Sequence, residues 1–252
     1  MVHEIDFKII GDDMQMVEVE LDPQEAVRAE IGVMMYMEQG IEMLTGTGGG
    51  IMSGLKRMIT GESFFISSFI NNSNAKRKVG FAAPYPGKII NINPADFGGS
   101  FLVQKDGFLC AAQGIEINVA FTKKIGAGLF GGEGFILQRL EGNGHTFLHA
   151  GGTIIKRELQ AGEQLRVDTG CLVGFDPRVD YDIKFIGGFK NALFGGEGLF
   201  FALLTGPGTI FLQSLPFSRL ADRVVSASRS WGGREESRGL GGLFGGIISG
   251  NE

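Results

Sequence analysis

The chain has 252 residues, of which 42 are glycine and 21 are phenylalanine, and its formal net charge is −5 at pH 7. Its length and its hydrophobic content of 43% allow a sizeable core, and glycine at this frequency without a collagen period indicates many turns and strand kinks. The negative charge disfavours a protein that binds nucleic acid by neutralising phosphates, because such proteins present a basic face.

Residues 1–6 have neither the basic start nor the apolar run of a signal peptide, so we expect a cytoplasmic protein. The two cysteines, Cys110 and Cys171, are too few for a disulfide framework in a chain of this size. We expect both to be reduced and buried as small apolar side chains.

Apolar and acidic residues alternate over residues 16–21, which predicts a strand with one buried face. A polar turn, a strand around Val27, a glycine at Gly32 and a further strand over residues 33–37 follow. The same order of strand, strand, glycine and strand occurs twice more. In the second copy these are residues 88–92, the strand around Leu102, Gly107 and residues 108–112. In the third copy they are residues 153–159, the strand around Leu165, Gly170 and residues 171–175. On this alignment Cys171 corresponds to Phe108.

A second signature, glycine followed by glutamate and then apolar residues, occurs once in each copy, at Glu62, Glu133 and Glu197. Short strands separated by glycine turns indicate an all-β fold. The sequence therefore predicts three tandem β repeats, over residues 1–92, 93–158 and 159–225.

After residue 225 the composition changes. Residues 226–239 are rich in serine, arginine and glycine, which predicts a flexible linker. The tail that follows is apolar and too short to span a bilayer, and its candidate docking residues are Leu240, Leu243, Phe244, Ile247 and Ile248. It would either dock on its own ring, a neighbouring subunit or a membrane surface, or be a disordered end.

The repeated Leu-Phe-Gly-Gly-Glu-Gly of residues 129–134 and 193–198, the pattern Gly-Glu-x-Leu-x-Val-x-x-Gly of residues 162–170 and the glycine-rich tail resemble a family of poorly characterised bacterial proteins. That family includes the mitochondrial "altered inheritance of mitochondria" biogenesis proteins. The resemblance implies a TRAP-like fold, a short double-stranded β-helix or sandwich related to the tryptophan RNA-binding attenuation protein. It also implies a pseudo-threefold subunit, three of which would form a homotrimeric ring.

Glu62, Glu133 and Glu197 are the best candidate site residues, because they hold one equivalent position in each copy. They could bind a cation or line a pore, but we favour a structural role in which each accepts backbone hydrogen bonds of its turn. His145 and His149 would lie about 13 Å apart on a strand, which is too far for a shared metal. The sequence thus predicts no catalytic residue, metal or cofactor.

We therefore expect a non-enzymatic, cytoplasmic, ring-forming scaffold or partner-binding protein, with an unidentified protein partner. The alternatives are an RNA or small-ligand binder, a membrane-associated biogenesis factor that uses the tail for peripheral contact, and an enzyme with an unrecognised site. The basic pairs and triplets that could serve RNA, at 76–78, 123–124 and 156–157, do not hold equivalent repeat positions, which disfavours regular RNA reading.

Overall fold

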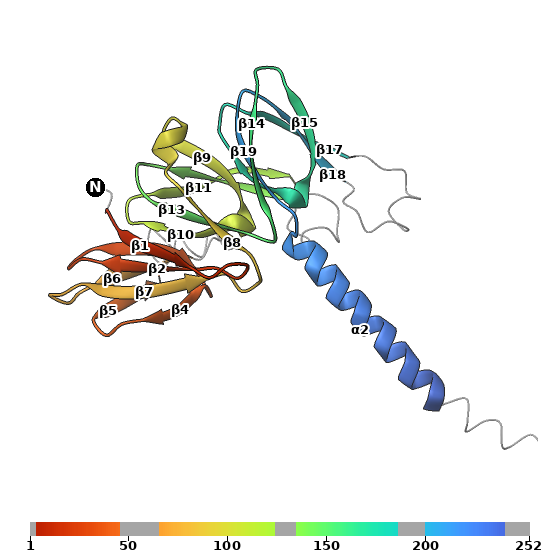
Figure 1. Cartoon of the computed structure of the whole chain (residues 1–252), viewed down its shortest axis with the longest axis horizontal. Coiled ribbons are helices and arrows are strands. Elements are labelled where there is room, and N and C mark those ends of the chain that lie inside the picture. Colours follow the sequence, from red (N-terminus) through yellow and green to blue (C-terminus); the bar gives the residue numbers. More distant parts are fainter. Residues whose placement is uncertain (1–3, 46–65, 124–134, 186–199, 240–252) are drawn as a thin grey trace, which may run out of the picture.

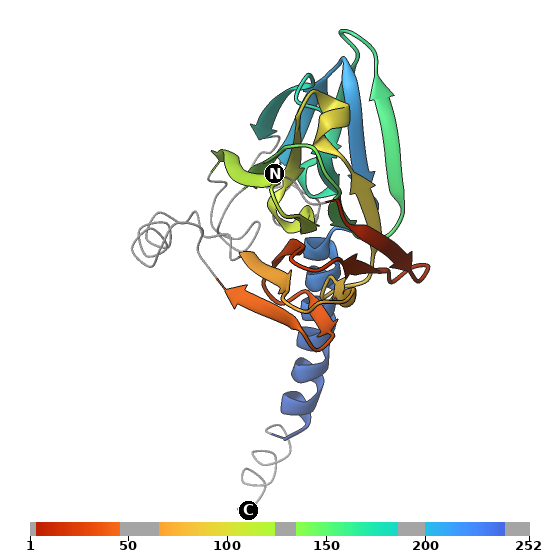
Figure 2. The ribbon, with the colours of Figure 1, turned by 90° about the vertical axis from the view of Figure 1, so that its left-hand side faces the viewer.

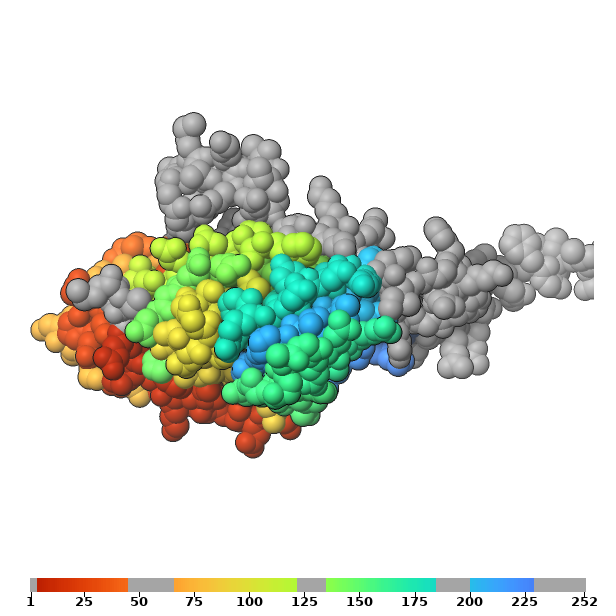
Figure 3. Space-filling view, turned by 90° about the horizontal axis from the view of Figure 1, so that it is seen from above, coloured from red at the N-terminus to blue at the C-terminus, as the bar shows by residue number. Residues whose placement is uncertain are grey.

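The computed structural model describes residues 4–45, 66–123, 135–185 and 200–239, and within them the chain consists of antiparallel strands, short 3-10 turns and one long helix. The expectation of an all-β fold is confirmed. Figure 1 shows the strands gathered into groups that follow one another along the chain, and Figure 3 shows the same order in space, from red to blue. We call them groups one, two and three.

Group one contains β1 (Asp6–Ile10), β2 (Met16–Leu21), β3 (Ala26–Glu30), β4 (Met34–Met37), β5 (Ile41–Thr45), β6 (Ile66–Asn71) and β7 (Arg77–Ala82). Group two contains β8 (Lys88–Ile92), β9 (Ser100–Gln104), β10 (Phe108–Ala112), β11 (Glu116–Lys123), β12 (Phe135–Glu141) and β13 (Thr146–Ala150). Group three contains β14 (Ile154–Leu159), β15 (Gln164–Asp168), β16 (Leu172–Phe175), β17 (Asp180–Phe185), β18 (Phe200–Thr205) and β19 (Gly208–Gln213).

Each group repeats one pairing scheme. In group two, β13 lies between β8 and β10, while β12 lies between β9 and β11. The corresponding strands of groups one and three pair in the same order, so β4, β10 and β16 are equivalent, and so are β3, β9 and β15. This pairing places β8 in group two and β14 in group three, each across a predicted repeat boundary.

Neighbouring groups are joined by continuous sheets. β10 pairs with β3 and β16 pairs with β9, and we call these two pairings seam one and seam two. They create six-stranded sheets in the orders β5-β6-β3-β10-β13-β8 and β11-β12-β9-β16-β19-β14. The remaining strands form the end sheets, β1-β2-β7-β4 in group one and β15-β18-β17 in group three.

Central strands of the seam sheets, such as β10 and β16, are buried on both faces. In β10, Phe108 and Ala111 pack in the hydrophobic cluster of group two, whereas Leu109 and Cys110 pack in the cluster of group one. A strand with two buried faces carries an unbroken apolar run, which is what residues 108–112 show. β2 belongs to an end sheet with one packed face and therefore alternates between buried and partly exposed residues.

The predicted alignment of the repeats on Gly32, Gly107 and Gly170 is wrong by one residue in group two. Strand pairing aligns Phe108 with Leu172, and therefore Gly107 with Cys171. The reason is conformational: Gly32 has a φ of +89°, which favours glycine, whereas Gly107 and Gly170 do not have positive φ values. Because their backbone conformation does not require glycine, Gly107 and Gly170 can occur at different positions of the repeat.

The predicted linker is also corrected. Residues 226–239 belong to helix α2 (Phe217–Gly239), which projects away from the strand groups in Figures 1 and 2. Its first turn is closed by the Pro216 carbonyl, which accepts from the N–H groups of Arg219 and Leu220. Once such a turn has formed, arginine, alanine, glutamate and serine extend it at little cost. Among the described residues, no helix has the length and apolar character needed to cross a bilayer.

Candidate functional site

Two sets of predicted site residues lie outside the described residues, so both predictions stay predictions. They are the carboxylates Glu62, Glu133 and Glu197, and the tail residues Leu240, Leu243, Phe244, Ile247 and Ile248. The candidate site below is built from the strands that the structure does describe.

The structure does not bring His145 and His149 together. His145 lies by Asn91 and packs edge-on against Phe7, with ring centroids 4.8 Å apart. His149 is buried against Tyr85, and burial lowers the pKa of His149 to about 4. The described part of the chain contains no group of three or more His, Cys, Asp or Glu side chains that could hold a metal ion.

Seam one shows how two strand groups join. Its facing residues are Cys110 and Ala29, Ala111 and Arg28, and Ala112 and Val27. Beyond this ladder, the Gln113 N–H donates to the Ala26 carbonyl at 3.1 Å. The Arg28 side chain crosses the seam, and its Nη1 donates to the Ile115 carbonyl at 3.0 Å. Burial lowers the pKa of the Arg28 guanidinium, and the nearby Glu116 carboxylate opposes that shift.

Seam two has the same register, with Gly174 facing Val103 and Phe175 facing Leu102. A β-bulge fixes the alignment of the strands that form the seams. It lies between Phe108 and Cys110 in β10, between Leu172 and Gly174 in β16, and between Met34 and Tyr36 in β4. Tyr36, Cys110 and Gly174 are therefore equivalent, although β4 belongs to neither seam.

Within the residues that the structure describes, two strands of the seam type have no neighbouring group. Among the described strands, β4 pairs only with β7 and β15 pairs only with β18. Their equivalents form both seams: β10 and β16 on one side, β3 and β9 on the other. β4 and β15 are thus two open edges with complementary roles, and we take them as the candidate site.

The β4 edge exposes apolar side chains where the seams bury them. Met35 is 56% exposed, whereas its equivalents Leu109 and Val173 are 0% and 1% exposed. Tyr36 and Met37 are 38% and 40% exposed. Single exposed apolar residues are ordinary on protein surfaces, but three in a row on an unpaired strand form a template for pairing with another chain.

The ring of Tyr36 lies over Gly80 of β7, where a Cβ atom would come within 2.5 Å of the ring. The residues equivalent to Gly80 are Phe147 in β13 and Phe211 in β19. Both phenylalanines pack in the hydrophobic cluster of the preceding group. At the open edge the aromatic ring comes from β4 instead of β7, and no preceding strand group among the described residues covers it.

Hydrogen bonds hold the β4 edge in place. The Tyr36 hydroxyl donates to Glu18 of β2, and Lys78 Nζ contacts the other Glu18 oxygen at 3.0 Å. The hydrogen bonds from Tyr36 and Lys78 lower the pKa of Glu18, and the bond to Glu18 raises the pKa of Tyr36 to about 12. The Lys78 N–H also donates to the Glu38 carboxylate at 3.0 Å. The edge strand is therefore already positioned in the single chain.

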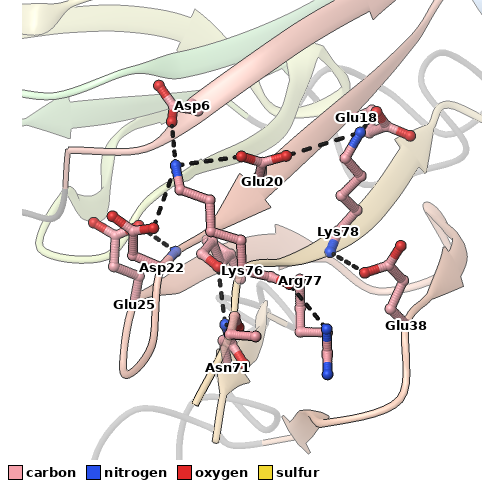
Figure 4. A network of polar contacts seen from close by, with 12 residues as sticks. Asp6, Glu18, Glu20, Asp22, Glu25, Glu38, Asn71, Lys76, Arg77 and Lys78 are labelled. Atoms are coloured by element: carbon pink, nitrogen blue, oxygen red, sulfur yellow. Dashed lines mark hydrogen bonds and ion pairs between the residues drawn. The ribbon is translucent and has the colours of Figure 1, made fainter. Parts of the chain in front are cut away.

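Two basic residues of the same sheet, Lys76 and Lys78, are paired with carboxylates (Figure 4). Lys76 Nζ lies 3.0 Å from Asp6, 3.3 Å from Glu20 and 3.3 Å from Asp22. The triplet at 76–78, which the sequence offered as part of a basic rim for RNA, thus sits among acidic side chains. Its field is largely cancelled within the sheet.

The β15 edge presents one exposed cation. Arg166 points outward and makes no hydrogen bond or ion pair with any described residue. Val167 is buried and Leu165 is partly buried against the cluster of group three. At the end of the strand, Asp168 pairs with Arg219 of α2 at 3.2 Å, so the helix starts beside this edge.

Sequence reasoning did not identify these edges, although one signal was present. The segments aligned as second strands contain an arginine at the same place in groups one and three, Arg28 and Arg166. Only the structure shows that Arg28 donates to a carbonyl across a seam. Arg166 has no equivalent acceptor among the described residues.

Comparisons with known proteins agree with the resemblance seen in the sequence. The model of the family described as mitochondrial biogenesis AIM24 matches residues 7–215. An uncharacterised protein of Streptococcus pyogenes serotype M6, M6_Spy0233, is 28% identical over 214 residues, which cover 82% of this chain and 84% of that protein. The crystal structure of protein SPYM3_0169 from Streptococcus pyogenes matches with a TM-score of 0.74 at 25% identity, covering 89% of this chain and 100% of that one.

Proposed function

The chain belongs to the mitochondrial biogenesis AIM24 family, and on that premise we propose that it is a non-enzymatic, cytoplasmic scaffold that assembles with copies of itself and holds a protein partner. The assembly is a homotrimeric ring, in which the strand groups of each chain are TRAP-like repeats of a pseudo-threefold subunit. One observation carries the proposal: the row of strand groups has an open sheet edge at each end, β4 in group one and β15 in group three, and the equivalents of these two strands form both seams.

Further observations support this role. The apolar side chain of Met35 is exposed in β4, whereas the equivalent side chains of β10 and β16 are buried by the neighbouring group. The paired lysines at the β2–β7 surface favour a protein contact over RNA, which would require unpaired positive charge. Cys110 and Cys171 are free thiols, in keeping with a reducing compartment. The tail after residue 239 remains the predicted contact for a partner or a membrane surface.

The test is the solution mass of the full chain by light scattering. The proposal expects three times 27.0 kDa for the unchanged protein. Met35→Asp places a charge at a position that the seams bury, so this variant should have the mass of one chain and an unchanged circular dichroism spectrum. A mass of 27.0 kDa for the unchanged protein at every concentration would contradict the proposal.

A further inference from the structure

We propose that β15 of one chain pairs with β4 of a second copy in the register of the internal seams. The facing residues across this contact are Tyr36 and Val167, Met37 and Arg166, and Glu38 and Leu165. The inference rests on the proposed self-assembly and adds the strands, the register and the polar contacts that it uses.

The register follows from equivalence, since both seams obey one rule. Cys110 faces Ala29 in seam one, and Gly174 faces Val103 in seam two. The bulge in β4 makes Tyr36 the equivalent of Cys110 and Gly174. The ladders of β3, β9 and β15 with their inner neighbours make Val167 the equivalent of Ala29 and Val103. Tyr36 of the second copy therefore belongs opposite Val167.

The apolar surfaces also correspond. In seam one, Leu109 and Phe147 of group two complete the cluster of group one. The equivalent of Leu109 is Met35, and the place of Phe147 is taken by the ring of Tyr36 over its glycine. In the contact between chains these side chains cover the cluster of group three, whose edge holds the partly buried Leu165.

The polar contacts of seam one also have equivalents at the contact between chains. Arg28 donates to the Ile115 carbonyl across seam one, beside Glu116. The equivalent of Arg28 is Arg166, and the equivalents of Ile115 and Glu116 are Ile41 and Glu42 of the second copy. Arg166 therefore donates to the Ile41 carbonyl of that copy and lies beside its Glu42 carboxylate.

A backbone contact extends the same comparison. The Gln113 N–H donates to the Ala26 carbonyl at the end of seam one. The equivalent pair between chains is the Gln39 N–H and the Gln164 carbonyl. Seam two has Leu102 and Pro177 at the positions of Arg28 and Gln113, so it can make neither contact. The open edges thus carry the polar features of seam one.

The contact joins two different edges, so an open assembly keeps one free β4 edge and one free β15 edge until it closes. Such head-to-tail contacts generate rings when the rotation closes and filaments when it does not. In the resulting sheet the strand order is β17-β18-β15 from one chain, followed by β4-β7-β2-β1 from the next.

Disulfide formation between separate full-length chains tests the register. Tyr36→Cys is made in one chain and Val167→Cys in another, and the two are mixed and oxidised. Facing residues of an antiparallel ladder have Cα atoms about 4.5–5.5 Å apart, which suits a disulfide. Tyr36→Cys also introduces the residue that β10 carries at this position, Cys110, and Glu38→Cys with Leu165→Cys is a second pair if the first does not fold.

We expect a covalent species of twice 27.0 kDa in the mixture, and none from either variant alone or from the unsubstituted chain. Arg166→Cys, offset by one residue and directed to the opposite face, is the register control and should cross-link at least ten-fold less than Val167→Cys. Cross-linking of Tyr36→Cys with itself, or equal yields with Arg166→Cys, would overturn the inference.

The mass of the same mixture, measured by light scattering before oxidation, separates the two claims. Oligomers without the expected disulfide would overturn the register and leave the self-assembly standing. A single-chain mass would overturn both.

Discussion

β10 and β4 occupy the same place in their strand groups and share the same bulge, yet one is buried and the other is exposed. The difference lies in the neighbouring strand: β10 pairs with β3, whereas β4 has no partner besides β7 in the part of the chain that the structure describes. A chain built from a fixed number of groups leaves one edge of each kind at its ends. The internal seams therefore describe, within one molecule, the contact that the ends lack.

The largest difference between β10 and β4 should appear when equivalent side chains are truncated. Leu109→Ala removes a fully buried side chain from seam one and should lower the free energy of unfolding by about 2–5 kcal/mol. Met35→Ala at the open edge should lower it by less than about 1 kcal/mol in the single chain, because Met35 is exposed there. Urea unfolding at low protein concentration measures both, and equal losses would show that the two strands have the same surroundings.

A second difference lies at the ends of the equivalent strands β3 and β9. The last residue is Glu30 in β3 and Gln104 in β9. Burial raises the pKa of Glu30 to about 7, Asp106 adds to the shift and Lys105 opposes it. A carboxyl whose pKa is higher in the folded chain destabilises the fold as the pH rises above its unfolded pKa. Glu30→Gln should therefore stabilise the protein by about 3 kcal/mol at pH 8 and have little effect at pH 4.

Unfolding in urea at those two pH values measures the effect of Glu30→Gln. A gain of equal size at both pH values would mean that the substitution acts through packing and not through ionisation.

A smaller difference separates His149 from its equivalent in group three, Gln213. The Gln213 amide donates to the Gly170 carbonyl and accepts from the Gly151 N–H, both at 2.8 Å, whereas His149 Nδ1 has no partner among the described residues. Because burial lowers the pKa of His149 to about 4, the unfolded chain binds the proton first as the pH falls below about 6.5.

The His149 contribution to stability should thus decline by about 2 kcal/mol between pH 7 and pH 5. His149→Gln should remove that decline, which unfolding free energies of variant and parent at both pH values will show. An unchanged difference between pH 7 and pH 5 would assign the dependence to other groups.

The smallest expected effect concerns charge across the open edges. Arg166→Glu and Glu42→Arg should each weaken assembly by about ten-fold or more, and the doubly substituted chain should recover part of the loss. Lys184→Glu, in β17 at the far edge of the same end sheet, is the matched control. Sedimentation at several concentrations gives the dissociation constants, and a double variant no better than the single variants would contradict the pairing of these residues.

The all-β fold could be predicted because alternation over residues 16–21 reports a strand packed on one face. The equivalence of residues 16–21, 88–92 and 153–159 also corresponds to equivalent strands, β2, β8 and β14. The open edges could not be predicted in this way. Met35 and Leu109 are both apolar residues of short strands, and their exposure differs only because of pairing with a distant segment.

Helix α2 was missed for a different reason. Residues 226–239 have the serine, arginine and glycine content of a linker, and composition alone does not show that a helix begins at Phe217. That start depends on the turn after Pro216 and on the contact of Arg219 with Asp168, both of which require the folded strands. Local pattern therefore predicts strands packed on one face, whereas long-range pairing decides where sheets and helices end.

Hydrogen–deuterium exchange of the two open edges tests the central claim most directly. At concentrations where the protein assembles, backbone amides of residues 34–38 and 164–168 should become protected to the level of residues 108–112 in seam one. In the Met35→Asp variant the same amides should exchange freely while seam one stays protected. Rapid exchange at both edges in the assembled protein would show that copies of the chain meet through another surface.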